Sequence, residues 1–420
     1  MLALSPLLVF LATYMVSSIA AGDFYKVPVS AAFLLASIYA IAITPGQLGR
    51  RIETFSAGAG NSNVLTMVWI FILAGAFAGT AKDIGAVDAT VNAALRIIPP
   101  RMIFAGLFLT ACFISMAVGT SVGTIVALVP IASGIAVQGG IELPYMAAII
   151  VGGALFGDNL SFISDTTIAA TRAMGCEMRD KFKVNIQIIL PAVLIVTAIY
   201  LIQGQDAGAI TVPDSIQWYK LIPYILIIAM ALAGCNVMLI LSTGIAVNAA
   251  IGAACGAFTW TGWLGSVGRG IAGMNDLIVV TLLAGGLLEI IRSNGGLTWI
   301  TESLTRRIDG KRGAQFSIAA MVALSNLCTA NNTIAIITCG GIAKDITDRY
   351  GIDPRKTASI LDTFSCLIQG IIPYGAQILM AAGLAGCAPS AILPHLYYPV
   401  LMGLCAILAI VFRLPRKYSL

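Results

Sequence analysis

The chain has 420 residues, of which 59% are hydrophobic and 10% are charged, and its mean hydropathy is +0.94. This composition excludes an ordinary soluble domain and is typical of a membrane protein with several α-helical spans. An outer-membrane barrel is excluded as well, because the apolar runs do not alternate as barrel strands do. The formal net charge of +5 does not indicate nucleic-acid binding, since the basic residues lie in short loops between apolar runs.

Two of the apolar runs along the chain are too long for one crossing, which needs about 20 residues. These two runs are 101–138, with Gly119-Thr120-Ser121 in its middle, and 313–343, with the polar stretch 329–333. We expect each to fold as a re-entrant hairpin whose polar tip lies inside the membrane. The runs in chain order are about 5–21, 27–43, 64–81, 101–138, 145–170, 185–203, 218–241, 244–263, 275–292, 313–343, 357–386 and 395–412.

The run 145–170 is interrupted by Gly157-Asp158-Asn159 and then carries hydroxyl and carboxylate groups over 161–167. A charge at bilayer depth is costly, so an intramembrane carboxylate is by default a functional hypothesis. Unwound backbone at that depth is tolerated only where protein or a water-filled cavity surrounds it. The stretch therefore predicts a broken helix that carries a cation site. The run 357–386, interrupted around Gln369-Gly370 and 373–375, is predicted to be a second broken helix.

The basic clusters predict the orientation in the membrane, because cytoplasmic loops are enriched in Lys and Arg. If both hairpins return to their own side, the clusters at 172–183, 306–312 and 344–356 fall on the side of Arg50-Arg51. Arg413, Arg416 and Lys417 then end on that side too. We therefore expect a multi-pass protein of the cell inner membrane with cytoplasmic N- and C-termini.

The two halves of the chain resemble each other at a constant offset of 210 or 211 residues. Leu73-Ala74-Gly75 is repeated at 283–285, and Gly175 at Gly386. Further matches are Gly85 with Gly296, Arg96 with Arg307, and Ser115 with Ser325. We predict inverted-topology repeats over 1–203 and 218–420, joined by an external linker at 204–217, as in many secondary transporters. The alternative is that apolar segments resemble one another by composition alone.

Asp158, Ser161 and Asp165 have i, i+3 and i+7 spacing, so on a helix two carboxylates and a hydroxyl would share one face. Hard cations take oxygen ligands, and a helix half that ends at a break adds its negative dipole end. We therefore predict a sodium site at Asp158 and Asp165. The alternative is that these carboxylates cap helices. The predicted cation-binding residues are Asp158, Asn159, Ser161, Ser164, Asp165, Thr166, Thr120 and Ser121.

A second polar group surrounds the tip of the second hairpin and the second break. Gln369 stands where the repeat offset places Asp158, so this break is neutral where the first is acidic. That difference suggests a polar or organic ligand here, although packing between helices is an alternative role for such residues. The predicted second-site residues are Thr329, Asn331, Asn332, Thr333, Gln369, Asp362 and Gln377. Glu289 and Arg292 are interpreted as a local ion pair.

The segment Gly157-Asp158, Ser161 and Ser164-Asp165-Thr166 resembles the signature of the NhaC-type sodium/proton antiporters, which belong to a larger ion-transporter superfamily. Phe162 stands where that family often has proline, and 329–333 is similar to the hairpin tips of related families. The resemblance implies sodium coupling more firmly than proton antiport, because the family includes exchangers and co-transporters of carboxylates or amino acids.

The most direct interpretation is a sodium-coupled secondary transporter that exchanges Na⁺ for H⁺ by alternating access. The alternative is a Na⁺-coupled symporter or exchanger of a small amino acid or carboxylate. An enzyme is disfavoured by the single histidine and the lack of HExxH and GxSxG motifs, and two breaks suit alternating access better than a fixed channel pore. The expected partners are the lipid bilayer, Na⁺, H⁺ or a small organic solute and a second copy in a homodimer, with no nucleic acid and no cofactor.

Overall fold

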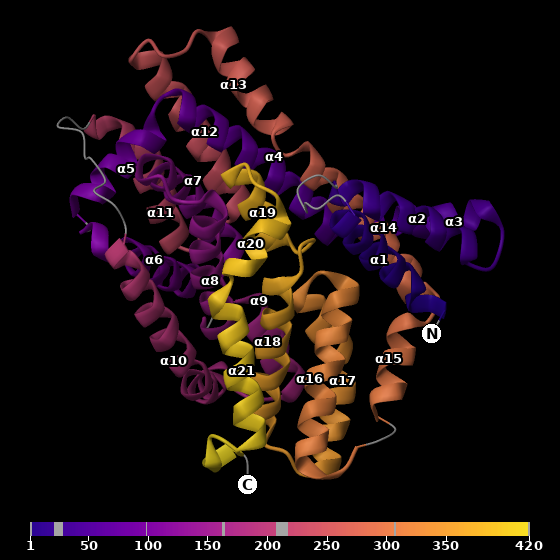
Figure 1. The fold of residues 1–420 in the computed structure, drawn as a ribbon. Coiled ribbons are helices and arrows are strands. Elements are labelled where there is room, and N and C mark those ends of the chain that lie inside the picture. The colour runs from indigo at the N-terminus through magenta and orange to yellow at the C-terminus, as the bar shows by residue number, and fades with distance from the viewer. Residues whose placement is uncertain are drawn as a thin grey trace.

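The computed structural model of the chain describes residues 2–20, 28–97, 99–161, 164–206, 217–305 and 308–418. Within these ranges the chain folds into helices and forms no strand, which confirms the predicted all-α class (Figure 1). Seven helices of this described part are long and apolar enough to cross a membrane, or up to nine if each bent pair is one span. Residues 207–216 of the predicted linker, Phe162, Arg306 and Arg307 lie outside the described residues.

The helices fall into two successive series. The first series is α1 (Ser5–Ala20), α2 (Val29–Ile43), α3 (Leu48–Ala59), α4 (Ser62–Asp83), α5 (Ala86–Ile97), α6 (Ile103–Val118), α7 (Ser121–Gly139), α8 (Leu143–Leu160), α9 (Asp165–Met174) and α10 (Met178–Gln203). The second series is α11 (Ile222–Leu232), α12 (Val237–Ala254), α13 (Trp260–Ala272), α14 (Asn275–Ser293), α15 (Gly296–Thr305), α16 (Gly310–Thr329), α17 (Asn332–Tyr350), α18 (Pro354–Ile371), α19 (Ala376–Ala385), α20 (Pro389–Ile392) and α21 (Tyr397–Val411). The predicted runs 218–241 and 244–263 are therefore wrong in detail, since α11 ends at Leu232 and α12 spans the gap between them.

Corresponding helices of the two series begin and end at a constant offset. Helices α7, α8 and α9 each start and stop 211 residues before α17, α18 and α19. Gly175 and Gly386, which follow α9 and α19, both have left-handed φ angles, +67° and +68°. The matching boundaries agree with the predicted repeat. That the second copy is inverted in the membrane stays a prediction.

The crossing of α6 with α8 is fixed by the same kind of bond as the crossing of α16 with α18. The Ser115 hydroxyl donates to the carbonyl of Ala154 at 2.5 Å, and the Asn326 amide donates to the carbonyl of Ser365 at 2.6 Å. Each residue of the second bond lies 211 positions after its counterpart in the first. The structural counterpart of Ser115 is therefore Asn326, one residue after the Ser325 that the sequence comparison selects.

Each half also supplies the helix that covers the other half's hairpin. Helix α9 packs on α17, and α19 packs on α7. Helices of the two halves also pack on each other where α4 contacts α13 and where α14 contacts α3. At the α4–α13 crossing, a β-carbon on Gly75 would lie 2.4 Å from the carbonyl oxygen of Gly270, so only glycine allows this approach. The two halves therefore form one body.

The two predicted hairpins are pairs of helices joined by tight turns. Helix α6 is followed by Gly119, which has φ +75°, and α16 is followed by Ala330, which has φ +47°. In Figure 1, α16 and α17 run side by side as a long pair. The polar tips thus lie where the sequence places them, at 119–120 and 330–331. Their re-entry on one side of a bilayer stays a prediction, and each arm of the first hairpin is long enough to be a candidate span.

Both broken helices exist, but the first break lies later than predicted. Gly157, Asp158 and Asn159 are still helical, and α8 continues to Leu160 before α9 begins at Asp165. The predicted shared face of Asp158, Ser161 and Asp165 is therefore wrong, because Asp165 belongs to a different helix. The second break lies between Ile371 and Ala376, which is the equivalent position 211 residues on.

Several basic segments lie at one end of the molecule. The Tyr350 hydroxyl donates to the carbonyl of Ile308, and the Lys356 ammonium donates to the carbonyl of Leu414. In Figure 1 the C-terminus lies at the same end as the outer ends of α16 and α17. The basic segments near 308–312, 349–356 and 413–417 are therefore close together in the fold, whereas α3, which carries Arg50 and Arg51, lies apart from them in Figure 1.

Candidate functional site

Asp158 links the first broken helix to the tip of the first hairpin. Its carboxylate accepts the backbone N–H of Ser121 at 2.9 Å and the Ser121 hydroxyl at 2.5 Å. Thr120, the residue before α7, makes no side-chain cap bond in the described part of the chain, so Asp158 serves as the cap of α7. Asp158 is buried, and so are Ser121 and Asn159. Asp158 thus caps a helix of the neighbouring hairpin, and its role in cation binding stays a prediction.

The carbonyl groups at the end of α8 are bound by side chains that follow the break. Ser164 and Thr166 both donate to the carbonyl oxygen of Asp158, at 2.7 and 2.9 Å. The last turn of a helix leaves carbonyls without intrahelical partners, and these groups also carry the negative end of the helix dipole. The buried Ser161, Ser164 and Thr166 therefore gather around an oxygen-rich helix end, as the sequence predicts.

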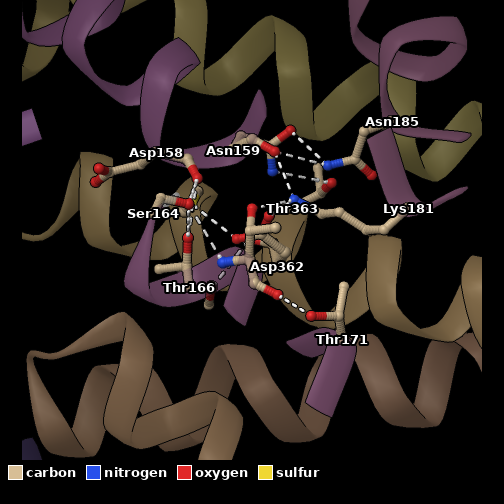
Figure 2. Close-up of polar contacts among 12 residues, drawn as sticks. Asp158, Asn159, Ser164, Thr166, Thr171, Lys181, Asn185, Asp362 and Thr363 are labelled. Atoms are coloured by element: carbon tan, nitrogen blue, oxygen red, sulfur yellow. Dashed lines mark hydrogen bonds and ion pairs between the residues drawn. The ribbon is translucent and has the colours of Figure 1, made fainter. Parts of the chain in front are cut away.

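Lys181 lies beside the same helix end, although its basic cluster predicts a loop position. It was assigned to a cytoplasmic loop, but α10 already begins at Met178 and the Lys181 side chain is 1% exposed. Its ammonium donates to the carbonyl of Asn159 at 2.6 Å and to the Thr167 hydroxyl at 2.8 Å, and forms an ion pair with Asp362 (Figure 2). Lys181 shares a helix face with Val184, which is also buried, so helical periodicity is a signal that could have found it.

Asp362 belongs to this first group and not to the second site where it was predicted. It comes from α18, and the pair that it forms with Lys181 is completely buried. Its neighbour Thr363 accepts a hydrogen bond from the Asn159 amide at 3.2 Å, and Asn185 donates to the Asn159 carbonyl at 2.9 Å. Figure 2 shows these side chains converging from the two halves of the chain.

A hydrogen-bonded chain connects the first site to the tip of the second hairpin. Gln377 donates to the Ser121 hydroxyl at 2.9 Å and accepts from the Gln369 amide, also at 2.9 Å. The same Gln369 amide donates to the carbonyl of Ala330 at the second tip, at 3.1 Å. The Gln369 side-chain oxygen is buried and has no partner among the described residues. The two predicted constellations are therefore one connected polar network.

The other predicted residues occupy the edges of this network. Asp165 is exposed in the first turn of α9, and Thr120 is half-buried. Asn331 caps α17 by accepting the backbone N–H of Ile334, and Thr329 donates to the Asn331 carbonyl. The Asn332 side chain lies against the Cys366 sulfur, and Thr333 is half-buried beside it.

A cavity of about 130 Å³ lies beside the second tip. Its wall combines the tip residues Thr329 and Asn331 with the Glu289–Arg292 ion pair, whose charged atoms are 3.4 Å apart. Tyr374, from the second break, also lines it. The local ion pair predicted from the sequence therefore lines a cavity.

The charges of the buried site do not cancel. Among the described residues, the buried charged side chains are Asp158, Asp362, Lys181 and Lys356. Lys356 binds the Leu414 carbonyl near the C-terminus, away from the break. Two carboxylates and one ammonium remain around the break, and when both carboxylates are ionised they leave one negative charge. Such a site can take one monovalent cation or one proton.

The sequence profile of the Na⁺/H⁺ antiporter family matches residues 3–204 and 214–414. The chain belongs to the Na⁺/H⁺ antiporter family. As a member of the Na⁺/H⁺ antiporter family it is a multi-pass membrane protein and a secondary antiporter, and the predicted NhaC-type resemblance is confirmed.

This member of the Na⁺/H⁺ antiporter family is similar to several curated proteins over most of their length. The malate-2H⁺/Na⁺-lactate antiporter of Bacillus subtilis is 25% identical, over 80% of this chain and 79% of its own. The Na⁺/H⁺ antiporter NhaC of the same organism is 24% identical, over 83% of this chain and 84% of its own. The arginine/ornithine antiporter ArcD of Halobacterium salinarum is 23% identical, over 82% of this chain and 78% of its own.

Proposed function

We propose that this chain exchanges Na⁺ for H⁺ by alternating access, with Asp158 as the carboxylate that binds either ion in turn. The observation that supports this is the net charge of the buried site. Two carboxylates and one ammonium leave one negative charge without a counter-ion. A buried charge without a partner is costly, so the site favours being occupied by either one Na⁺ or one proton. Because one carboxylate serves both ions, binding of one displaces the other.

The oxygen atoms around Asp158 are suitable ligands for sodium. An ionised carboxylate has about four acceptor positions, and Ser121 uses two of those on Asp158. The Ser121 hydroxyl supplies a neutral oxygen at the carboxylate itself. The hydroxyls of Ser164 and Thr166 supply others at the backbone carbonyl of Asp158, which ends α8. Asp165, exposed at the start of α9, adds negative charge beside the site and would attract cations towards it.

The contact between Asp158 and the first hairpin tip suggests how access alternates. A Na⁺ that binds between the carboxylate and the Ser121 hydroxyl would hold the tip against the break, and replacing it with a proton would weaken that contact. We take the end that carries the C-terminus to be cytoplasmic and the bilayer to be the cell inner membrane, since the basic segments near 308–312, 349–356 and 413–417 lie at that end. We regard the chain as a transporter without enzymatic activity, and expect a homodimer.

Sodium-dependent proton flux in proteoliposomes tests this proposal. Asp158→Asn keeps the size of the side chain but removes its charge, so we expect exchange and sodium binding to be lost. Asp180→Asn is the control, because Asp180 is a partly exposed carboxylate paired with Lys183 on the outer turn of α10. Asp165→Asn distinguishes two roles for the Asp165 carboxylate. Loss of exchange indicates that it is a sodium ligand, and a modest rise in the sodium concentration required indicates that it only attracts cations. Exchange at the full rate in Asp158→Asn would falsify the proposal.

A second candidate function is sodium-coupled exchange of a small organic acid or amino acid. The cavity beside the second tip favours it, since Arg292 offers a planar donor fork for a carboxylate and Glu289 offers an acceptor for an ammonium group. The volume of about 130 Å³ is close to that of an engineered cavity of about 150 Å³ that holds benzene. Two of the relatives are named as antiporters of organic solutes, malate with lactate and arginine with ornithine.

A panel of short carboxylates and amino acids, tested with and without sodium, decides between the two functions. The readout is the shift in thermal unfolding of the purified chain, which grows with ligand concentration for anything that binds the folded state. We expect a true substrate to lose its effect in Arg292→Gln and to keep it in Arg269→Gln, an exposed arginine of α13 paired with Asp83. If no solute shifts the transition, the organic-solute function is rejected and ion exchange alone remains.

A further inference from the structure

The Lys181 ammonium occupies a cage of oxygen atoms that is built from three helices. The carbonyl oxygen of Asn159 comes from the end of α8, the Thr167 hydroxyl from α9, and the Asp362 carboxylate from α18. All four residues are buried. An ammonium group has three N–H donors, so these three oxygens use all of them. Figure 2 shows the Lys181 side chain extending into this group from α10.

The cage contains the same kinds of ligand as the proposed sodium site next to it. A carboxylate, a hydroxyl and a helix-end carbonyl surround Lys181. At Asp158 the same three kinds of oxygen are its own carboxylate, the Ser121 hydroxyl bound to that carboxylate, and its own helix-end carbonyl. Hard cations prefer oxygen ligands of this kind. Asp158 and Asn159 are consecutive, so the two oxygen groups share the end of α8. The oxygen group around Lys181 holds a cation that is part of the protein, and the oxygen group at Asp158 does not.

The second half of the chain has no copy of this arrangement. The repeat offset of 211 places Ile392 opposite Lys181 and Val151 opposite Asp362. Both of these residues are apolar and buried. The lysine and its carboxylate are therefore not required by the architecture that the two halves share, and belong to the first break alone.

We propose that the Lys181 ammonium is a tethered occupant of a second monovalent-cation site. The wild-type chain then binds one mobile cation, at Asp158, because the neighbouring site is already filled by the protein itself. Removing the ammonium while keeping the cage creates a vacant site with a full negative charge at Asp362. The chain without the ammonium takes up a second Na⁺. This inference rests on the proposed function only in naming Asp158 as the first site.

Counting bound sodium by equilibrium dialysis with radioactive Na⁺ tests the inference directly. We expect one Na⁺ per chain for wild type and two for Lys181→Ala. Asp158→Asn with Lys181→Ala is expected to bind one, and Lys181→Ala with Asp362→Asn also one, because the second cage then lacks its charge. Lys183→Ala is the matched control: this lysine is two residues away on α10, half-exposed and paired with Asp180, and we expect one Na⁺.

Stability measurements give a second readout that does not depend on transport. A vacant cage predicts that Lys181→Ala is stabilised by Na⁺ and by methylammonium, whereas wild type does not respond to methylammonium. N-methylglucamine chloride at equal ionic strength is the control, since this cation is too large for the cage. If Lys181→Ala folds only in sodium or methylammonium, that result supports the inference.

The outcomes that overturn it differ from those that overturn the proposed exchange function. Lys181→Ala that binds no more than one Na⁺ and does not respond to methylammonium shows that the lysine is only a structural ion pair. The same conclusion follows if no cation restores a folded Lys181→Ala chain while the double variant with Asp362→Asn folds. In contrast, if the single variant Asp158→Asn still binds one Na⁺, the sodium site proposed at Asp158 is refuted. The proposal for the Lys181 ammonium is then decided by the Lys181→Ala measurements.

Discussion

Gln377, in the second half of the chain, donates a hydrogen bond of 2.9 Å to Ser121, which lies 256 residues earlier at the tip of the first hairpin. Ser121 in turn donates to Asp158. The hydroxyl of Ser121 is thus held between a carboxylate of one half and an amide of the other. Movement of the second broken helix must change the environment of the Asp158 carboxylate through this contact.

Replacing Gln377 with methionine removes this contact at similar volume. It removes the donor to the Ser121 hydroxyl and one of the two acceptors of the Gln369 amide, which keeps the Ala330 carbonyl. We expect a loss of stability of about 1 kcal/mol, since hydrogen bonds between membrane helices contribute about 0.6 kcal/mol on average. We also expect a higher sodium concentration for half-maximal exchange. Gln187→Met is the control, because among the described residues Gln187 is bonded only to its own helix, at the Lys183 carbonyl. Equal behaviour of the two variants in thermal unfolding and in flux would contradict the coupling role.

Competition at one carboxylate predicts a simple dependence of sodium binding on pH. In the range where Asp158 is mostly protonated, the apparent Kd for Na⁺ should rise about ten-fold for each unit that the pH falls, because one proton leaves as one Na⁺ binds. Isothermal titration at a series of pH values measures this slope. A slope near zero is the result that excludes exchange at a shared carboxylate. Ser121→Ala should keep the slope and raise the Kd about ten-fold, which corresponds to about 1.4 kcal/mol.

Gly157→Ala should destabilise the chain even though alanine favours helices. A β-carbon there would lie 2.1 Å from the Ser115 hydroxyl oxygen and 2.3 Å from the Ser115 carbonyl carbon, so α6 would have to move away from α8. Overpacking of this kind costs about 1–3 kcal/mol. Gly49→Ala in α3 is the control, since no described atom lies within 4 Å of its β-carbon position. Its stability should be unchanged or slightly raised. Similar melting shifts for the two variants would show that the α6–α8 approach is not tight.

Asp353 should stabilise α18 at neutral pH and not in acid. It caps the helix by accepting the Arg355 backbone N–H at 2.9 Å, and its carboxylate also pairs with the Arg355 guanidinium. Burial alone would raise the pKa of Asp353, but the hydrogen bonds from Arg355 and the charge of its guanidinium outweigh burial and hold the pKa below its usual value. A lowered folded pKa contributes stability above the unfolded pKa of about 3.9, and this contribution is lost as the pH falls through the folded pKa.

Asp353→Ala should therefore lower stability by about 1 kcal/mol near neutral pH, which is typical of a lost N-cap. The difference from wild type should shrink below about pH 4, as the wild-type carboxyl becomes protonated. Thermal unfolding across this range measures the difference. Asp348→Ala, on the last turn of α17, controls for removing an acidic residue at the same end. A difference that stays constant with pH would show that the carboxylate charge is not what stabilises α18.

The helical class, the hairpins and the two breaks follow from hydropathy and polar interruptions, because these features are local. The position of the first break does not. Asp158 and Asn159 remain helical since their side chains are bound by Ser121 and Thr363, which lie 37 and 204 residues away. Sequence patterns cannot show such partners, so the polar residues themselves were taken as the point of unwinding.

The grouping of Asp158 with Ser121, Ser164 and Thr166 was predictable, because these residues lie at one break and one tip. Lys181 was missed because it stands among basic residues that do lie outside the core, and its partner Asp362 is 181 residues later. Charge patterning alone treats all lysines of a cluster alike. The short helices α3, α5, α13 and α15 were also missed, since they are less apolar than a membrane span.

The reciprocal packing of the halves has a consequence for synthesis. When the ribosome has completed α10, neither Asp362 nor Gln377 exists yet, so Lys181 has no counter-charge and the first hairpin has no covering helix. Lysine is unfavourable within lipid, and its long side chain can extend to the headgroup region. We therefore expect the start of α10 to stay near the membrane surface during translation and to move inward only after α18 has been inserted. A chain that stops before Asp362 would leave Lys181 without its counter-charge and the first hairpin without its covering helix.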